Sequence, residues 1–505
     1  MSGLSFSNPA SPRRNFFVVL VLTTAVKLWL AAAIPFTGDE SYFWLWGQNP
    51  SWGGFYDHPP MAGWWLWAMD KLSSSTLVLR LPAVLLWIAI AFGLMDLLRR
   101  AQPYATDKAW LLGALFLVLP FTWSLNLVTT DTPLIFFLFF SGYAFLRAEQ
   151  NGSTGWLAVS GFLLGLALLS KYFAGLLAIA YAVALLPRGP RAWGRLLIIA
   201  GCAAPFMGLN LAWNATHCWD NILFNLFNRN AASEFDPLLL LVYLGMMLYL
   251  LTPWSAARMV RHGKVRGTLP LIALFGVPFA LFFALAFYKT IGLHWVLAFL
   301  PFFFLWVGLS ADQDALRSDH KWTLLLGLPH LLALALLAHF PSDAIKGRKL
   351  HTDIVAHREA PALIARFRQE LPTGATVMSP SYSFASILSY HARSRVPVFG
   401  PGSYHARFDD SLTNFQDYDG RAIRVVSAKP LREEAFLPFF DSVRLQEIDV
   451  SGARFWIADG VGFRFHAYRE EVLSGIAKNY YRAPSWLPAA SCKFLEQYDL
   501  PRESR

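Results

Sequence analysis

The sequence predicts a polytopic α-helical membrane protein with a small α/β domain in its C-terminal part. Of its 505 residues, 55% are hydrophobic and only 15% are charged, whereas a soluble chain carries about 25% charged residues. Apolar stretches of membrane-spanning length follow one another up to about residue 340. Beyond that point the chain is polar, and short alternating runs at 422–428, 442–450 and 453–461 predict strands.

The apolar stretches are long enough to give about eleven transmembrane helices. One stretch, Trp156 to Pro187, is too long for an ordinary span and is interrupted by Ser170, Lys171 and Tyr172. It is either one tilted helix or a hairpin of two short helices. The other nine predicted spans are 16–36, 77–98, 109–128, 131–146, 194–213, 237–257, 268–288, 291–310 and 322–340.

The distribution of basic residues favours the hairpin. With a hairpin, fifteen Lys and Arg residues fall on one side of the membrane and at most five on the other. Because cytoplasmic loops are the basic ones, this places the N-terminus in the cytoplasm and the C-terminal part outside it. The fifteen are Arg13, Arg14, Arg99, Arg100, Lys108, Arg147, Arg188, Arg191, Arg195, Arg258, Arg261, Lys264, Arg266, Arg317 and Lys321. A net charge of +10 spread over such loops argues against a nucleic-acid surface.

We therefore predict two domains, a transmembrane domain over 1–340 and an extracytoplasmic α/β domain over 341–505. The first apolar run is too long for a signal peptide and is expected to be retained as a helix. In the first outer loop, 36–76, a proline pair followed by three tryptophans predicts a surface helix over Met61–Leu72. The three cysteines lack metal-ligand spacing. Free thiols are favoured, with a Cys218–Cys492 disulfide as the alternative.

The first outer loop also carries acidic residues next to a membrane surface, where carboxylates are costly without a partner or a task. Asp39 and Glu40 either favour a helix N-terminus or supply a general base. They are adjacent and do not share a helical face. Asp57 and His58, which follow Tyr56, either bind a metal or a substrate, or Asp57 caps the next helix.

Further polar residues fall on the same outer side. Asp131 is a helix N-cap candidate, with an ion pair to Lys171 as the alternative. Arg80, Lys171 and Arg229 each suit a snorkelling position, and together they favour the phosphate of an anionic lipid headgroup. His294 and Trp295 are also consistent with an aromatic belt.

The acidic pair after the first span, followed by Tyr56-Asp57-His58-Pro59-Pro60, resembles bacterial lipid-linked glycosyltransferases. These belong to the GT-C superfamily with a protein O-mannosyltransferase-like membrane domain, which includes the aminoarabinose transferase of lipid A. Thr-Asp-Thr-Pro at 130–133, Ser-Lys-Tyr at 170–172 and His-Trp at 294–295 match further motifs of the group. The resemblance covers about residues 16 to 310.

The resemblance implies a hexosyl or pentosyl transferase in the bacterial inner membrane. Its donor would be an undecaprenyl-phosphate sugar, and its acceptor lipopolysaccharide or lipid A, another glycan or a protein on the periplasmic face. No soluble cofactor is implied. Asp39 would be the catalytic acidic residue, with Glu40 in support. The residues implied to contact substrate are Tyr56, Asp57, His58, Arg80, Asp131, Lys171, Tyr172, Arg229 and His294.

Two departures from the family pattern concern the acceptor and the metal. Asp57-His58 stands where the aminoarabinose transferase has a Glu-Lys pair, which weakens the case for a lipid A phosphate acceptor. The stretch Phe224 to Asn230 contains no histidine, although that transferase binds a metal through one there. A divalent metal ion is left open.

Two other functions compete with glycosyl transfer. A transporter or flippase of lipid-linked sugars would show paired halves and ionisable residues near the membrane midplane, whereas here they gather near one surface. A lipid-binding protein without activity would tolerate loss of Asp39.

Overall fold

The computed structural model describes residues 11–124, 126–230, 234–262, 269–400 and 407–504. The chain divides into two compact units. The first, called here the membrane unit, comprises Met1–Ile34, Ser75–Met207 and Ser233–His339. The second, called the sheet unit, comprises Pro35–Ser74, Gly208–Ala232 and Phe340–Arg505. Lys264 and Arg266, counted above among the cytoplasmic charges, lie outside the described residues.

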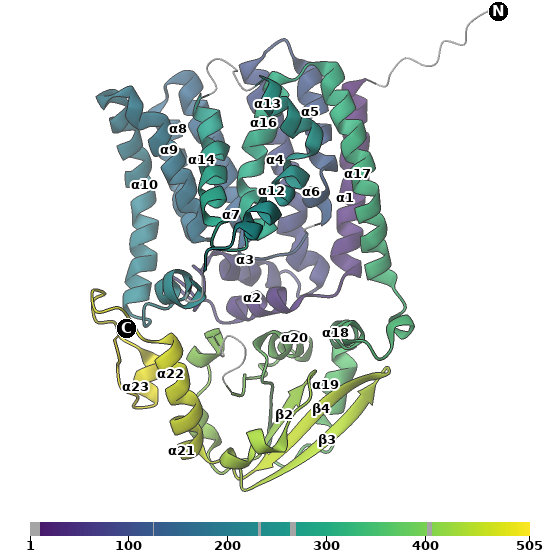
Figure 1. Cartoon of the computed structure of the whole chain (residues 1–505), viewed down its shortest axis with the longest axis vertical. Coiled ribbons are helices and arrows are strands. Elements are labelled where there is room, and N and C mark those ends of the chain that lie inside the picture. Colours follow the sequence, from purple (N-terminus) through teal and green to yellow (C-terminus); the bar gives the residue numbers. More distant parts are fainter. Residues whose placement is uncertain (1–10, 125, 231–233, 263–268, 401–406, 505) are drawn as a thin grey trace, which may run out of the picture. The chain divides into compact units, whose positions relative to one another are not determined.

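The membrane unit is a set of apolar helices that run side by side (Figure 1). They are α1 (Pro12–Ala33), α4 (Thr76–Ala101), α5 (Thr106–Val118), α6 (Pro120–Ser124), α7 (Asp131–Asn151), α8 (Thr154–Leu168), α9 (Gly175–Leu185), α10 (Pro190–Ala215, whose last turns belong to the sheet unit), α12 (Pro237–Leu251), α13 (Pro253–His262), α14 (Leu269–Leu285), α15 (Leu293–Val296), α16 (Leu300–Ser310) and α17 (Gln313–His339).

Within the described residues, five helices are long and apolar enough to cross a membrane. A sixth is added if α12 and α13, which meet at 95°, form one bent span. The chain is thus a multi-pass membrane protein, as predicted. The five are α1, α4, α10, the continuous segment Leu293–Ser310 and α17. Shorter apolar helices occupy Thr154–Leu168, Tyr172–Arg188 and Leu269–Leu285, so the count of eleven spans stays a prediction.

The interrupted run after Trp156 is a hairpin, as the charge distribution predicts. The hydroxyl of Ser160 on α8 lies 3.2 Å from that of Tyr181 on α9, and Ser141 on α7 lies 2.7 Å from the same tyrosine oxygen. In one continuous helix, residues 160 and 181 would lie about 31 Å apart at 1.5 Å per residue. The chain therefore turns back at the Ser170–Tyr172 interruption.

The sheet unit is built on a four-stranded mixed sheet in the order β1 (Thr376–Met378), β2 (Ile423–Ser427), β4 (Ala453–Val461), β3 (Ser442–Val450). Strands β1 and β2 are parallel, and β4 is antiparallel to both β2 and β3. All three predicted strands are confirmed. Strand β1 has only three residues and gave no alternating pattern.

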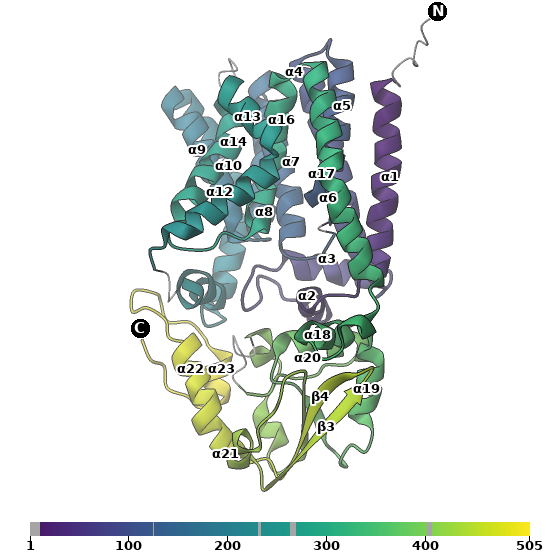
Figure 2. The same ribbon diagram turned by 45° about the vertical axis from the view of Figure 1, so that its right-hand side comes forward.

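Three helices cover one face of this sheet (Figures 1 and 2). They are α18 (Lys349–Arg358), α19 (Ala360–Arg368) and α20 (Tyr382–Ala392). Their apolar residues Leu363, Phe367 and Phe384 join Val426 of β2 and Phe455 of β4 in one buried cluster. An apolar sheet face covered by amphipathic helices is the usual α/β core.

The predicted first outer loop forms two packed helices of the sheet unit, α2 (Gly38–Gln48) and α3 (Met61–Asp70). The helix predicted over Met61–Leu72 is therefore present. The rings of Trp46 and Phe55 stack 4.5 Å apart, and the Trp44 indole donates to Asp70 over 2.9 Å. The remaining short helices of this unit are α11 (Asp220–Ile222), α21 (Phe465–Tyr468), α22 (Ser474–Tyr480) and α23 (Lys493–Gln497). The independent domain over 341–505 stays a prediction.

The preference for three free thiols was wrong. Cys218 and Cys492, 274 residues apart, form a disulfide with their Cα atoms 4.5 Å apart, and Cys202 is free. The Cys218 amide donates to the Ser491 carbonyl over 2.9 Å, and the Trp219 indole donates to the Pro488 carbonyl over 2.8 Å. These contacts hold the segment after α10 beside the C-terminal segment. Because the two cysteines are so far apart in the sequence, no local pattern indicates that they pair.

We expect Cys218→Ser to lower the free energy of unfolding of the sheet unit by about 2–4 kcal/mol, because the open chain gains entropy without the crosslink. Thermal unfolding of the purified chain measures the change, with Cys202→Ser as the matched control. Non-reducing peptide mapping should give one linked peptide. Rapid labelling of Cys218 by a maleimide without reductant would contradict the bond.

Candidate active site

The first-loop acids have different environments although they are neighbours. Thr37 and Glu40 form a capping box at the start of α2. The Glu40 carboxylate accepts from the Thr37 amide over 3.1 Å and from its hydroxyl over 3.0 Å, and the Glu40 amide donates to the Thr37 hydroxyl over 3.3 Å. Glu40 is fully buried, whereas Asp39 is exposed. The helix-terminus alternative is confirmed for Glu40.

Asp57 is buried in an ion pair instead of capping α3. Its two carboxylate oxygens accept, each over 3.1 Å, from the Tyr42 hydroxyl and from the Arg407 guanidinium. The N-cap of α3 is Pro60, so the capping alternative for Asp57 is wrong. Burial raises the pKa of Asp57 and Arg407 lowers it, while the charge of Asp39 adds a smaller rise. Asp39 therefore lies within electrostatic reach of this pair.

Arg407 comes from a part of the sequence where no motif pointed to a site. Its guanidinium carbon lies 4.2 Å from the centroid of the Tyr382 ring and 5.3 Å from that of Phe224. Aromatic faces stabilise a partly desolvated cation at such distances. A pairing of residues 57 and 407 gives no local signal in a single sequence.

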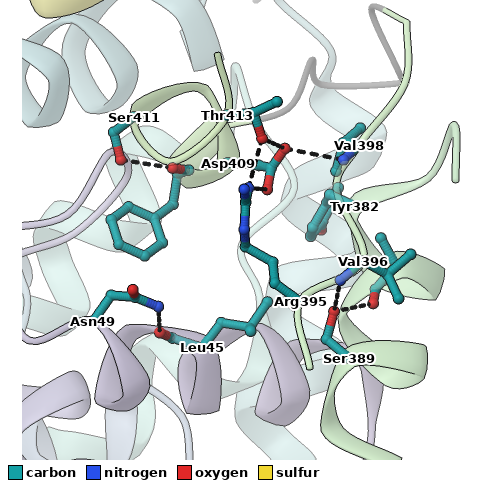
Figure 3. Close-up of polar contacts among 12 residues, drawn as sticks. Leu45, Asn49, Tyr382, Ser389, Arg395, Val396, Val398, Asp409, Ser411 and Thr413 are labelled. Atoms are coloured by element: carbon teal, nitrogen blue, oxygen red, sulfur yellow. Dashed lines mark hydrogen bonds and ion pairs between the residues drawn. The ribbon is translucent and has the colours of Figure 1, made fainter. Parts of the chain in front are cut away.

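A hydrogen-bond network fixes the turn Arg407–Ser411 (Figure 3). One oxygen of Asp409 accepts from Arg395 over 2.8 Å, and the other accepts from the Val398 amide over 2.9 Å and the Thr413 hydroxyl over 2.7 Å. Arg395 also donates to Thr413 over 2.6 Å. Because Asp409 is held on these sides, the neighbouring residues of the turn have defined positions.

Two further acids lie near the Asp57–Arg407 pair: Asp410, which is buried, and Asp220, which is half-buried. Asp410 accepts from the Tyr481 hydroxyl over 2.9 Å. The Oδ1 atom of Asp220 is buried and has no hydrogen-bond partner among the described residues. Burial raises the pKa of both carboxyls well above their usual value, and for Asp220 the charges of Asp410 and Asp57 add to the rise. Burial also raises the pKa of Tyr56, with Asp220 contributing.

The membrane unit brings three predicted residues together. The Lys171 ammonium donates to the two carboxylate oxygens of Asp131 over 2.8 and 3.0 Å, and both residues are buried. His294 Nε2 lies 4.0 Å from Asp131. The N-cap of α7 is Thr130, so the favoured capping role of Asp131 was wrong and its pairing with Lys171 is confirmed. Tyr172 begins the short helical turn that follows Lys171.

The other predicted site residues, Arg80, Arg229 and His58, each lie at a different place in the structure. Arg80 is buried and donates to the carbonyls of Ala31 over 3.1 Å and Ile34 over 2.7 Å. Arg80 therefore satisfies backbone carbonyls at the C-terminal end of α1. The sequence did not suggest this structural role. Arg229 is exposed in the turn Asn228–Asn230. His58 is half-buried, with its ring 6.4 Å from those of Trp46 and Phe224.

Among the described residues, no group of three or more His, Cys, Asp or Glu side chains is arranged to hold a metal ion. The buried carboxyls of Asp57 and Asp410 pair with Tyr and Arg side chains instead.

Comparison with known proteins gives a family match over part of the chain. Residues 57–212 match the model of the dolichyl-phosphate-mannose-protein mannosyltransferase family. Lipid A galacturonosyltransferase RgtD of Rhizobium johnstonii is 33% identical over 217 residues, which make up 41% of this chain and 44% of RgtD. The chain thus matches less than half the length of this curated relative.

Solved structures confirm the fold. ArnT from Cupriavidus metallidurans bound to undecaprenyl phosphate aligns with a TM-score of 0.64 at 13% identity, covering 88% of this chain and 97% of that one. The apo form of ArnT gives a TM-score of 0.59 at 14% identity, with 88% and 98% covered. The predicted fold, a polytopic helical membrane protein with a small C-terminal α/β domain, is confirmed by this likeness to ArnT.

We expect Asp220→Asn to stabilise the protein, and the gain to grow with pH. Because its pKa is raised, folded Asp220 binds its proton more tightly than the unfolded chain, whose carboxyl titrates near about 3.9. Ionisation of wild-type Asp220 therefore costs stability as pH rises above that value, and asparagine removes the cost. Unfolding midpoints at pH 5 and pH 8 measure the difference, with the exposed Glu434→Gln as control. An equal shift at both pH values would contradict the assignment.

Proposed function

We propose that this protein is an inverting glycosyltransferase that moves a hexose or pentose from a polyprenyl phosphate carrier to an envelope acceptor. The family match, the curated name of RgtD and the undecaprenyl phosphate bound by ArnT support this class of reaction. RgtD favours a lipid A or lipopolysaccharide acceptor. The transporter alternative has no comparable support among these relatives.

The observation that carries the proposal is the separation of roles among the first-loop acids. Glu40 is occupied by its capping box, and Asp57 is held by Tyr42 and Arg407. Asp39 is exposed at the start of α2, within electrostatic reach of Asp57 and Arg407. Of these three acids, Asp39 is therefore the one whose carboxylate can meet a substrate. Glu40 supports the reaction by fixing the helix that presents Asp39.

The chemistry is a single displacement at the anomeric carbon of the sugar. The acceptor hydroxyl gives its proton to the Asp39 carboxylate as its oxygen forms the new bond to the anomeric carbon. The bond from that carbon to the phosphate oxygen breaks, and the polyprenyl phosphate leaves with the electron pair. Lys171 and Arg229 stabilise the charge that develops on the phosphate. We assign Arg80 to the end of α1 and not to the phosphate.

We place the reaction on the periplasmic face of the inner membrane. The charge asymmetry favours the hairpin topology. That topology has eleven spans, a cytoplasmic N-terminus and an extracytoplasmic 341–505 domain. The Cys218–Cys492 disulfide supports this topology, since disulfides persist in oxidising compartments such as the periplasm. It links the loop after α10 to the C-terminal segment, so both are expected on that side.

We expect Asp39→Asn to slow transfer by at least about a thousandfold, roughly 4 kcal/mol in the activation barrier, with unchanged thermal stability. Asparagine keeps the size of the side chain but cannot accept the proton. Single-turnover transfer from a short-chain polyprenyl phosphosugar in detergent is the measurement. Glu40→Gln is the matched control, because glutamine also completes a capping box and should retain activity. Transfer by Asp39→Asn within about tenfold of wild type would exclude Asp39 as the base.

We expect loss of either phosphate-binding cation to slow the same single turnover by about a hundredfold, roughly 2.7 kcal/mol. Lys171→Gln alone also leaves Asp131 as an unpaired buried charge, which costs about 3–5 kcal/mol of stability. The double variant Asp131→Asn/Lys171→Gln removes both charges and should recover stability without recovering transfer. Arg229→Gln should slow transfer by the same factor as this double variant. A stable double variant with wild-type turnover would show that Lys171 is only structural.

A further inference from the structure

The sheet unit contains a cavity that none of the candidate active-site residues line. Its volume is about 910 Å³, which is the size of a typical small-ligand site. It lies at the carboxyl ends of the two parallel strands. The residues that follow β1, Pro380 and Ser381, line it, as do Ala428 and Lys429 after β2. In open α/β sheets, ligands bind outside the carboxyl ends of the strands.

The electrostatics of the cavity favour an anion. The first turns of α18 and α20, helices of ten and eleven residues, both contribute to its wall, so two helix N-termini direct positive dipole ends towards it. Arg348, Lys429 and Arg454 add three exposed cations to the lining, against one acid, Asp353. Arg454 lies 3.5 Å from the exposed Glu447, a weak surface pair.

A buried histidine in the wall indicates a ligand independently of these charges. His351 is only 1% exposed, lines the cavity, and its Nε2 atom has no hydrogen-bond partner among the described residues. Buried polar atoms are normally satisfied, by protein, by water or by what the site binds. The lining also includes Trp456 and Phe384, whose rings offer apolar surface beside the polar groups.

The cavity shares a residue with the surroundings of Asp39. Ser383 of α20 lines the cavity and packs directly on Gly38, where an added Cβ would lie only 1.9 Å from the Ser383 hydroxyl oxygen. Gly38 immediately precedes Asp39, and all of these residues belong to the sheet unit. A molecule held in the cavity is thus separated from the first turn of α2 by one serine.

We propose that this cavity binds a saccharide that carries a phosphate or carboxylate group, and that it holds the anionic part of the acceptor. The phosphate or carboxylate lies against Arg348, Lys429 and the helix N-termini, and a hydroxyl of the sugar pairs with His351. The assignment to the acceptor rests on the proposed function, whereas binding of an anionic saccharide does not.

The test is equilibrium binding to the purified full-length chain in detergent, followed by saturation-transfer NMR. The probes are glucosamine 1-phosphate, galacturonic acid, neutral galactose and inorganic phosphate. We expect the two anionic sugars to bind at least tenfold more tightly than galactose. Equal binding of galactose would overturn the role of charge. If inorganic phosphate binds as tightly as the anionic sugars, the claim that the cavity recognises a saccharide is overturned and the cavity is a simple anion site.

Two variants locate the binding. Arg348→Glu/Lys429→Glu should weaken binding of the anionic sugars at least tenfold. The matched control Arg421→Glu/Arg444→Glu makes the same charge change on exposed residues of the same unit that do not line the cavity. An equal loss in both would overturn the site. His351→Phe should weaken binding without loss of stability, because it replaces a buried polar atom that lacks a protein partner. Unchanged binding by His351→Phe would remove His351 from the site.

This experiment separates the two proposals. Binding requires no turnover, so a wild-type chain that binds anionic sugars but forms no product would contradict only the glycosyltransferase. A chain that transfers sugar but shows no charge-dependent binding would contradict only the cavity.

Discussion

The candidate site of the sheet unit depends on the buried ion pair between Asp57 in the first loop and Arg407 in the C-terminal part. Removing one member of a buried pair leaves an uncompensated charge, a loss of about 3–5 kcal/mol. The pair therefore constrains every element that carries or encloses it. Tyr42 donates to the acid, and the Tyr382 and Phe224 rings enclose the cation. Segments from three distant parts of the chain thereby form one site.

This constraint explains why the C-terminal segment is more than an accessory to the membrane helices. It supplies the positive partner of a first-loop acid, and the Asp409 network fixes the turn that carries that partner (Figure 3). The disulfide holds the loop after α10 to the same part of the chain. Without the C-terminal segment, Asp57 would be a buried acid of the aromatic-rich first loop with no positively charged partner.

Local patterns in the sequence predicted much of this structure. The strands at 442–450 and 453–461, the helix after Pro60 and the hairpin at Lys171 follow from periodicity, proline position and charge. The capping box of Glu40 was also readable, since Thr37 and Glu40 have the required spacing. Asp131 was misassigned because an acid before a helix suits an N-cap by sequence. Only the fold shows that Lys171 is close enough to compete.

What could not be predicted is nonlocal. Arg407, Asp220 and Asp410 lie in segments without a motif, and the two paired cysteines are 274 residues apart. Their importance comes from burial, which a single sequence does not report. The same holds for His351, an ordinary histidine in sequence that the fold encloses in a cavity wall.

The buried acids also bear on how an anionic substrate could approach. Asp57, Asp220 and Asp410 would place three negative charges against the single guanidinium of Arg407 if all were ionised. Burial raises the pKa of each of these carboxyls, and most strongly for Asp220 and Asp410. Protonated carboxyls donate hydrogen bonds and do not repel phosphate. The raised pKa values of Asp220 and Asp410 therefore favour their neutral forms, which limits repulsion of a phosphate-bearing donor, whereas Asp57 keeps its charge partner in Arg407.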